Sequence, residues 1–212
     1  MKTGIIFDLD GTLWDSSGNV IDSWNEYLAQ NTDLGLSFTH EQMKSFMGMT
    51  LEQIAALMFP MLPAEEGREL LRKCTQAEYR YLRTHTSFFY PGEKDVLREL
   101  SRDHILAIVS NCQNGYIQIF LEQCGFGNLF RDFECSGRSG LTKGENIKLV
   151  AQRNELEKCI FVGDTGLDGA AARAAGVPFV HADYGFCHPD DYDIRLEVFS
   201  ALPSAVEQLL GA

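Results

Sequence analysis

Two acidic residues lie two positions apart where an apolar segment near the start of the chain ends. The segment GIIFDL, residues 4 to 9, is typical of a short buried strand and leads into the polar string DGT. In an extended backbone Asp8 and Asp10 face the same side, so their carboxylates can reach one small volume. Taken alone, the same letters also fit an Asx-type turn whose acids are solvated.

A second acidic pair suggests what that volume could hold. Asp164 follows the apolar run CIFVG and therefore ends a strand, whereas Asp168 stands four residues later at the start of a helical pattern. Asp168 alone fits a first-turn acid favoured by the helix dipole as well as it fits a functional role. If the two strands are neighbours, Asp8, Asp10 and Asp164 form a cluster whose mutual repulsion calls for a cation. Oxygen ligands completed by water suit Mg²⁺.

Further polar side chains follow or separate the other predicted strands. Ser110 and Asn111 end the run ILAIVS, where a hydroxyl and exposed backbone N–H groups could cradle a phosphoryl oxygen. The same residues could instead cap the next helix. Lys143, in GLTKGEN, is placed in a loop between strands, where an isolated lysine is usually a solvated surface charge.

The order of the predicted elements decides whether these residues can meet. Apolar spacing predicts a bundle of helices through residues 16 to 90. After residue 90, short apolar runs alternate with helices at about 92–101, 144–154, 167–175 and 203–210, and a weak strand is expected around Val198 and Phe199. Such alternation implies right-handed crossovers and a parallel sheet covered by helices on both faces.

The predicted fold class is therefore α/β, a doubly wound, Rossmann-like parallel sheet with an inserted helical cap. Residues 1–15 and 91–212 are assigned to the core, and residues 16–90 to the cap that follows the first strand. Open parallel sheets bind ligands beyond the carboxyl ends of their strands. The polar clusters DLDGT, SN and GD all fall at such ends, and this convergence carries more weight than any single cluster.

Composition restricts the expected partners. The chain has 18 Lys plus Arg against 30 Asp plus Glu, a formal net charge of −12. A surface this negative repels nucleic acid and anionic membranes, whereas a small phosphorylated metabolite could still bind at a metal site. The six cysteines form no CxxC pair, and no apolar run matches a signal peptide or a membrane span. We expect a cytoplasmic protein with reduced thiols, either a monomer or a dimer.

The motifs stand in the order and spacing of those of the haloacid dehalogenase superfamily, which the chain resembles over nearly its whole length. The four motifs are FDLDGTLWD, VSN, Lys143 and GDTGLDGAAARAAG. The resemblance is to the branch of phosphoglycolate phosphatases and β-phosphoglucomutases. Two positions depart from the pattern. Lys143 is followed by Gly-Glu-Asn where Pro-x-Pro is usual, and the bulky Trp14 either packs the base of the cap or lines the cavity.

The resemblance implies a Mg²⁺-dependent phosphatase that acts on a small phosphorylated metabolite. Asp8 would attack phosphorus and become an aspartyl phosphate, while Asp10 would protonate the leaving group and then activate water. The metal would be held by the Asp8 carboxylate, the Asp10 carbonyl and the Asp164 carboxylate. The dehalogenases of the superfamily have no acid at the position of Asp10, so its presence favours phosphate ester chemistry.

The same resemblance implies roles for the remaining polar residues. Ser110, Asn111 and Lys143 would bind the phosphoryl oxygens. Thr12 would lie at the phosphate site and orient Asp10, and Asp168 would bond to Lys143 or to a metal-bound water.

The cap is expected to choose the substrate. The loop SFMGMT, residues 45–50, would reach over the site with Met47, Gly48 and Met49, and Lys44 is its one nearby cation. The scarcity of cations disfavours a strongly anionic substrate such as phosphoglycolate. Two alternatives stay open, a phosphosugar mutase of the β-phosphoglucomutase type and a non-catalytic binding relative, although the intact acids favour an enzyme.

Overall fold

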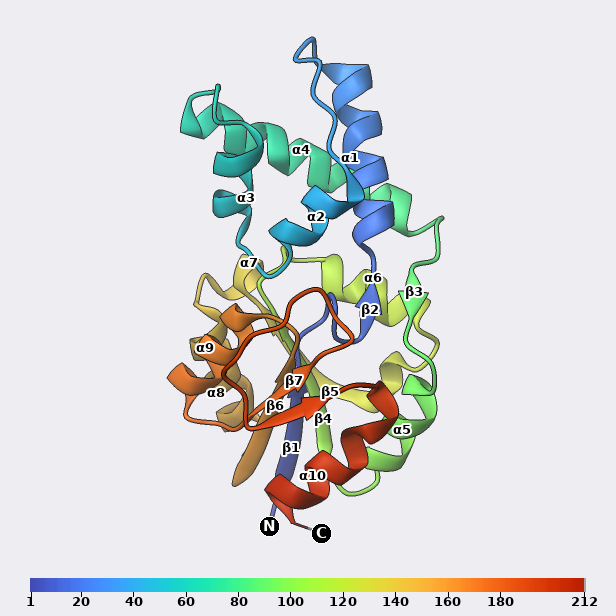
Figure 1. Ribbon diagram of the computed structural model, residues 1–212, viewed down its shortest axis with the longest axis vertical. Helices are drawn as coiled ribbons and strands as arrows, with labels where there is room; N and C mark the ends of the chain where they lie inside the picture. Colours follow the sequence, from blue (N-terminus) through green and yellow to red (C-terminus); the bar gives the residue numbers. More distant parts are fainter. Residues whose placement is uncertain (212) are drawn as a thin grey trace.

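A six-stranded parallel sheet forms the centre of the lower half of the molecule in Figure 1. The computed structural model describes residues 1–211 of the 212. The strand order is β5-β4-β1-β6-β7-β8, and every neighbouring pair is parallel. The strands are β1 (Thr3–Phe7), β4 (Ile105–Ser110), β5 (Phe130–Cys135), β6 (Lys158–Gly163), β7 (Phe179–Ala182) and β8 (Ile194–Leu196).

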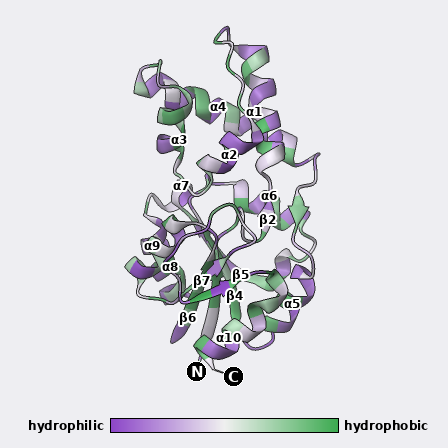
Figure 2. Ribbon diagram, in the orientation of Figure 1, coloured by the Kyte–Doolittle hydropathy of each residue, from purple (hydrophilic) through white to green (hydrophobic). Residues whose placement is uncertain are grey.

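Helices cover both faces of this sheet, as the alternation of elements predicts. Successive strand side chains point to opposite faces. Ile5 and Phe7 of β1 therefore join one apolar core, and Ile6 joins another. The first core includes residues of α5 and α10, and the second includes residues of α8 and α9. These helices are α5 (Glu93–Leu100), α8 (Lys143–Arg153), α9 (Gly166–Ala175) and α10 (Leu202–Leu210). In Figure 2 the strands between them are largely coloured as hydrophobic.

The four helices from residue 17 to residue 82 form the upper part of Figure 1 and pack mainly on one another. They are α1 (Ser17–Asn31), α2 (His40–Phe46), α3 (Leu51–Met58) and α4 (Ala64–Leu82). A two-stranded antiparallel ribbon, β2 (Trp14–Asp15) with β3 (Phe88–Phe89), joins them to the sheet. We propose that this ribbon marks the boundary between the cap and the core.

Trp14 packs against aromatic side chains beside this ribbon and is not among the described residues that line the cavity under the cap. Its ring is fully buried and meets Tyr116 and Phe120 edge to face, with ring centroids 5.6 and 5.4 Å away. Of the two roles considered for this bulky residue, the structure shows packing.

Shorter elements complete the chain that the structure describes. They are α6 (Tyr116–Gln123), α7 (Ser136–Ser139) and the 3₁₀ turns Gly127–Leu129 and Phe199–Ala201. The strand expected around Val198 and Phe199 is misplaced, because the last strand is Ile194–Leu196. Phe199 reaches the core from a turn instead, which explains why an apolar residue there resembled part of a strand.

The loop predicted around Lys143 is wrong, because Lys143 is the first residue of α8. The Thr142 hydroxyl accepts the Glu145 N–H, and the Glu145 carboxylate accepts the Thr142 N–H, which together cap this helix. Gly144 also has a reason to replace the proline usual after the motif lysine. A side chain at Gly144 would lie 3.1 Å from the Ala171 carbonyl, so the glycine lets α8 approach α9 closely.

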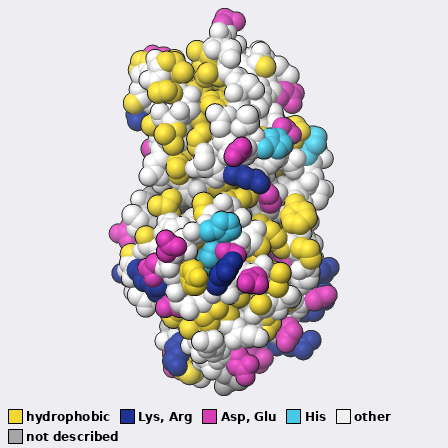
Figure 3. Space-filling view, viewed as in Figure 1, with side chains coloured by type: hydrophobic (Ala, Val, Ile, Leu, Met, Phe, Trp, Pro, Cys, Tyr) yellow, Lys and Arg dark blue, Asp and Glu magenta, His cyan; other side chains and the backbone are white. Residues whose placement is uncertain are grey.

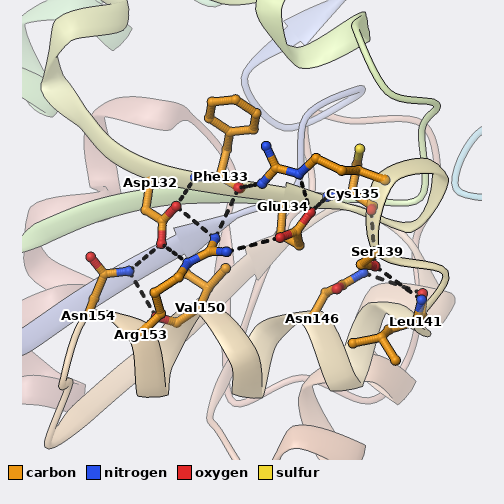
Figure 4. A network of polar contacts seen from close by, with 11 residues as sticks. Asp132, Phe133, Glu134, Cys135, Ser139, Leu141, Asn146, Val150, Arg153 and Asn154 are labelled. Carbon is orange, nitrogen blue, oxygen red and sulfur yellow. Dashed lines mark hydrogen bonds and ion pairs between the residues drawn. The ribbon is translucent and has the colours of Figure 1, made fainter.

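A polar network fixes α8 to the edge strand β5 (Figure 4). Arg153, at the end of α8, donates to both carboxylate oxygens of Asp132 at 2.8 Å and to Glu134 at 3.1 Å. Asn154 also donates to Asp132, at 2.6 Å. These bonds hold the far end of the helix whose first residue is Lys143, so they help to set the position of that lysine.

The outer surface carries charges of both signs and some exposed apolar side chains. On the face shown in Figure 3, basic and acidic groups are intermixed, and apolar side chains gather over the upper part where α3 lies. Leu57 and Met61, at the end of α3 and in the turn after it, are 55% and 57% exposed. No helix within residues 1–211 is both long enough and apolar enough to span a bilayer.

Candidate active site

The two acidic segments predicted from the sequence meet at the carboxyl edge of the sheet, beneath the cap, but the carboxylates that cluster are those of Asp8, Asp164 and Asp168 and not that of Asp10. Asp8 directly follows β1 and Asp164 directly follows β6, and these two strands are hydrogen-bonded neighbours. Ser110 ends β4, the neighbour of β1 on the other side. The chain builds one half of the sheet outward from β1 and then returns to build the other half. The ends of β1, β4 and β6 therefore lie at the point where the strand order reverses, the usual place for a ligand.

Lys143 joins two of the acids in a buried ion-pair triad. Its Nζ donates to Asp8 Oδ1 at 2.8 Å and to Asp168 Oδ1 at 2.6 Å, and all three side chains are at most 4% exposed. Burial alone would lower the pKa of Lys143, but the charges of Asp168 and Asp8 raise it above its usual value, so the ammonium is retained. Burial, and then the charge of Asp168, raises the pKa of Asp8 to about 7, with Lys143 opposing the rise.

Asp168 serves two structures at once. Its Oδ2 accepts the N–H and the hydroxyl of Thr165, at 3.0 and 2.6 Å, which caps α9. Its Oδ1 holds Lys143. The predicted bond between Asp168 and Lys143 is therefore present, and both oxygens of Asp168 are engaged by protein groups.

Asp164 is fully buried, and one of its oxygens lacks a protein partner. Oδ2 accepts the Phe186 N–H at 2.8 Å, whereas Oδ1 makes no hydrogen bond to any residue from 1 to 211. Burial, then the charges of Asp168 and Asp8, raise the pKa of this carboxyl well above its ordinary value. Gly11, at φ +80°, passes so close that any side chain there would collide with the Asp164 carboxylate.

The donor set fits a hard divalent cation. Asp8, Asp164 and Asp168 each offer a carboxylate oxygen, and these atoms lie within 4.8 Å of one another. Because both oxygens of Asp168 are engaged, the free oxygen of Asp164 and the carboxylate of Asp8 are the better placed ligands. Three buried carboxylates face one lysine, so the site holds more negative charge than the protein neutralises. The Oδ1 atom of Asp164, which is buried and has no partner among residues 1–211, is therefore well placed to bind such a cation.

In a second cluster of metal-binding residue types, the carboxylate is already paired with charged protein groups. His181, Asp183 and His188 each offer one ligand atom within 4.8 Å of the others. However, Asp183 is ion-paired with Arg195, and His188 lies 3.0 Å from the same carboxylate. These partners hold the pKa of Asp183 well below its usual value, Arg195 contributing most. The cluster is an ion-pair network beside the loop that carries Phe186.

Asp10 is held by two residues that the sequence did not point to. Its Oδ1 accepts the hydroxyls of Ser16 and Tyr116, both at 2.8 Å. Burial raises the pKa of Asp10 to about 6, and the bonds from Ser16 and Tyr116 oppose that rise. A carboxyl with this pKa exchanges a proton close to neutral pH, as a general acid and base requires.

Thr12 does not orient Asp10 as expected. Its hydroxyl is fully buried and has no hydrogen-bond partner in the described chain, while Ser16 and Tyr116 take the expected role. Ser16 lies just before a helix and could have been considered from the sequence. Tyr116 lies 106 residues from Asp10, and only the packing of α6 against the ribbon brings it there.

The cap loop closes over the site through Asn111. Its side-chain amide donates to the Gly48 carbonyl at 2.8 Å, and its carbonyl accepts the Ser136 hydroxyl at 3.0 Å. The neighbouring Ser110 is 5% exposed, and its hydroxyl accepts the Cys112 N–H at 3.3 Å. The Cα of Gly48 faces the Thr165 side chain, which a Cβ would meet at 3.3 Å, so the loop rests on the start of α9.

A cavity lies between the cap and the sheet edge and contains much of the predicted site. Asp8, Asp10, Ser110 and Asn111 line its lower wall. The upper wall includes Met47, Gly48 and Met49, as predicted, together with apolar residues of the cap helices and one acid, Glu78. Lys44 is exposed and does not line the cavity. Glu78 was missed because a single glutamate in an amphipathic helix gives no sign of where it points.

Comparison with known proteins places these features in a family context. A family model described as haloacid dehalogenase-like hydrolase matches residues 5–182. A phosphoglycolate phosphatase of Synechococcus elongatus is 30% identical, over 97% of this chain and 98% of its own, and that of Agrobacterium fabrum is 27% identical over 97% and 93%. A haloacid dehalogenase-like family protein from Streptococcus pneumoniae shares the fold, with a TM-score of 0.82 and 22% identity, over 96% of this chain and 98% of its own.

Proposed function

The chain belongs to the family of haloacid dehalogenase-like hydrolases and is a phosphoric monoester hydrolase, and we propose that it dephosphorylates a small metabolite through an aspartyl-phosphate on Asp8 with the help of Mg²⁺. The observation that carries this proposal is the arrangement around Asp8. Its carboxylate is fixed by Lys143 on one side and faces the Asp164 carboxylate on the other, whose Oδ1 has no hydrogen-bond partner among residues 1–211.

The first half of the reaction uses Asp8 as nucleophile and Asp10 as acid. A carboxylate oxygen of Asp8 forms a bond to phosphorus while the bond from phosphorus to the ester oxygen breaks. The leaving oxygen takes the proton of Asp10, whose pKa of about 6 allows a proton to be carried at neutral pH. The product alcohol departs and Asp8 carries the phosphoryl group.

The second half regenerates the enzyme. Asp10, now ionised, accepts a proton from a water molecule whose oxygen attacks phosphorus, and the bond to Asp8 breaks to release inorganic phosphate. Ser16 and Tyr116 keep the Asp10 carboxylate in place while its charge changes. Lys143 stays beside Asp8 throughout and binds a phosphoryl oxygen together with Ser110 and Asn111.

The metal site follows from the same residues. Asp8, the Asp10 carbonyl and Asp164 would hold Mg²⁺, with Asp168 positioning Lys143 from behind. When bound, the cation neutralises the repulsion between the carboxylates and the phosphate dianion.

The direct test is hydrolysis of p-nitrophenyl phosphate by the purified protein. We expect release of nitrophenol and inorganic phosphate with Mg²⁺, and loss of both with EDTA or in Asp8→Asn. Asp95→Asn, an exposed acid on α5, is the matched control. Free phosphate released without any added bisphosphate would separate hydrolysis from a mutase. Wild-type activity no higher than that of Asp8→Asn would refute the proposal and favour a binding protein.

A further inference from the structure

The cavity above the proposed nucleophile has two unlike walls. The sheet side presents polar groups, whereas the cap side presents mostly apolar side chains, among them Val20, Trp24, Met43 and Phe46. This apolar wall is interrupted by Glu78 of α4, which is 4% exposed and has no assigned role in the reaction. Burying an acid in an apolar wall costs free energy unless its oxygens are hydrogen-bonded, so the partners of both Glu78 oxygens matter.

Glu78 is fixed through one oxygen and leaves the other free. Its Oε2 accepts the Trp24 indole N–H at 2.6 Å. Its Oε1 makes no hydrogen bond to any described residue, although Glu78 lines the cavity. Burial, opposed by the Trp24 bond, raises the pKa of this carboxyl to about 8. Trp24 therefore fixes the side chain through Oε2, and Oε1 can form a hydrogen bond with a ligand in the cavity.

The charges around the cavity restrict that occupant. No Lys or Arg is found among the described residues that line it, whereas three acids, Asp8, Asp10 and Glu78, do line it. Lys143 is already bonded to Asp8 and Asp168. A carboxylate on the organic part of a substrate would therefore be buried beside acids without a cation of its own.

We propose that Glu78 selects phosphate monoesters whose organic part is uncharged and presents a hydroxyl group to the free oxygen of Glu78. This inference rests on the proposed phosphatase function and names its substrate class. A hydroxyl donates a hydrogen bond to ionised Glu78 and accepts a hydrogen bond from protonated Glu78, so it fits both forms. An ammonium group fits the ionised form alone and must itself be desolvated, and a carboxylate fits the protonated form alone.

The test uses three two-carbon substrates that differ only at the end remote from phosphate. They are 2-hydroxyethyl phosphate, phosphoglycolate and 2-aminoethyl phosphate, with a hydroxyl, a carboxylate and an ammonium group. We expect the wild-type kcat/KM for the hydroxyl compound to exceed the other two by about tenfold or more, the value of one hydrogen bond to a charged or buried partner. Glycerol 3-phosphate and 3-phosphoglycerate repeat the comparison with a longer reach.

The variant Glu78→Gln assigns the preference to this residue. Its amide can accept from Trp24 and turn an N–H toward the cavity, so the ratio of kcat/KM between hydroxyl and carboxylate compounds should fall to within about threefold. Glu93→Gln changes a glutamate that is equally buried but does not line the cavity, and it should keep the wild-type ratio.

The outcomes separate this inference from the function on which it rests. Equal or better cleavage of phosphoglycolate or 2-aminoethyl phosphate overturns it, and so does an unchanged ratio in a folded Glu78→Gln. If that variant does not fold, the wild-type ranking alone decides. In each of these cases hydrolysis of p-nitrophenyl phosphate by the wild type keeps the phosphatase proposal, whereas its absence removes both.

Discussion

The sheet edge and the cap cavity both bury carboxyl groups, but they neutralise them differently. At the edge, Asp8 and Asp168 share the ammonium of Lys143. In the cap, Glu78 receives one indole N–H and pairs with no Lys or Arg among residues 1–211. The contrast teaches where charge is needed. The edge keeps its acids beside a positive charge that a dianion can also use, whereas the cap keeps an acid that a neutral ligand can satisfy.

The comparison also separates chemistry from selection. The groups that would act on phosphorus come from three strand ends and the start of one helix, and hydrogen bonds fix nearly all of them. The residues that would touch the organic part come from the cap and are mostly apolar. Such a division allows the cap to change its substrate without disturbing the reacting atoms. The predictions below test the two regions in order of expected effect.

The largest effect is expected from removing the negative charge of Asp164 at the edge of the sheet. Asp164→Asn should lower kcat by about a thousandfold or more, because the cation loses a ligand. In EDTA the free energy of unfolding of the same variant should be about 1 kcal/mol higher than that of wild type, because one of three buried acids that repel one another has been removed. Kinetics and urea denaturation measure the two effects. An Asp164→Asn protein still stabilised by Mg²⁺ as much as wild type would contradict the site.

Removing the positive charge of Lys143 should have the next largest effect. Lys143→Met leaves Asp8 and Asp168 buried without a positive partner, so we expect the free energy of unfolding in EDTA to fall by about 3 kcal/mol. Loss of a phosphate ligand should lower kcat by about a hundredfold. Lys148→Met, an exposed lysine on the same helix, should change neither quantity by much. Equal stabilities for the two variants would argue against the ion-pair triad.

A smaller effect is expected at Asp10. Tyr116→Phe removes one of the two hydroxyls that hold the Asp10 carboxylate. We expect kcat to fall about tenfold, the usual value of one hydrogen bond to a charged group, with little change in KM. Tyr81→Phe, a tyrosine of the cap that does not line the cavity, serves as control. An unchanged kcat would leave Ser16 as the sole positioning residue.

The smallest effect concerns a buried glutamate that lies outside both regions. Burial raises the pKa of Glu93 from 4.5 to about 9. Between these values the folded protein holds a proton that the unfolded chain has lost, so the free energy of unfolding decreases as pH rises. Glu93→Gln should therefore match wild type near pH 5 and exceed it by about 1 kcal/mol near pH 6, because wild type loses about 1.4 kcal/mol for each pH unit between the two pKa values. Urea denaturation at both pH values, with the exposed Glu99→Gln as control, measures the difference. A constant offset would mean that Glu93 does not titrate in this range.

Local patterns predicted the sheet and the acids at its edge, because the end of a strand and the polar residues after it can each be recognised from a few consecutive residues. Asp8, Ser110 and Asp164 each follow an apolar run, and the parallel order brings those runs side by side. The start of α8 at Lys143 was not predicted, although the pair Thr142 and Glu145 that caps it is a local pattern in the sequence.

The remaining parts depend on contacts between distant segments. Tyr116 reaches Asp10 across 106 residues, and Trp24 reaches Glu78 across 54. A helical pattern shows which face of a helix is apolar, but it does not show which polar residue at the margin of that face will meet a cavity. The hydroxyl of Thr12 is a similar case, because its surroundings come from other loops.

The hydrogen bond from Asn111 to the Gly48 carbonyl has a consequence for how ligands enter and leave. It ties the cap loop to the residue that follows Ser110 at the end of β4. Lifting the loop to admit a substrate would break this bond and free the Asn111 side chain, and lowering the loop would restore it. Closing the cavity to solvent and completing the binding site would then happen in one step. The rate at which this hydrogen bond breaks and forms would limit turnover whenever the chemical steps are faster.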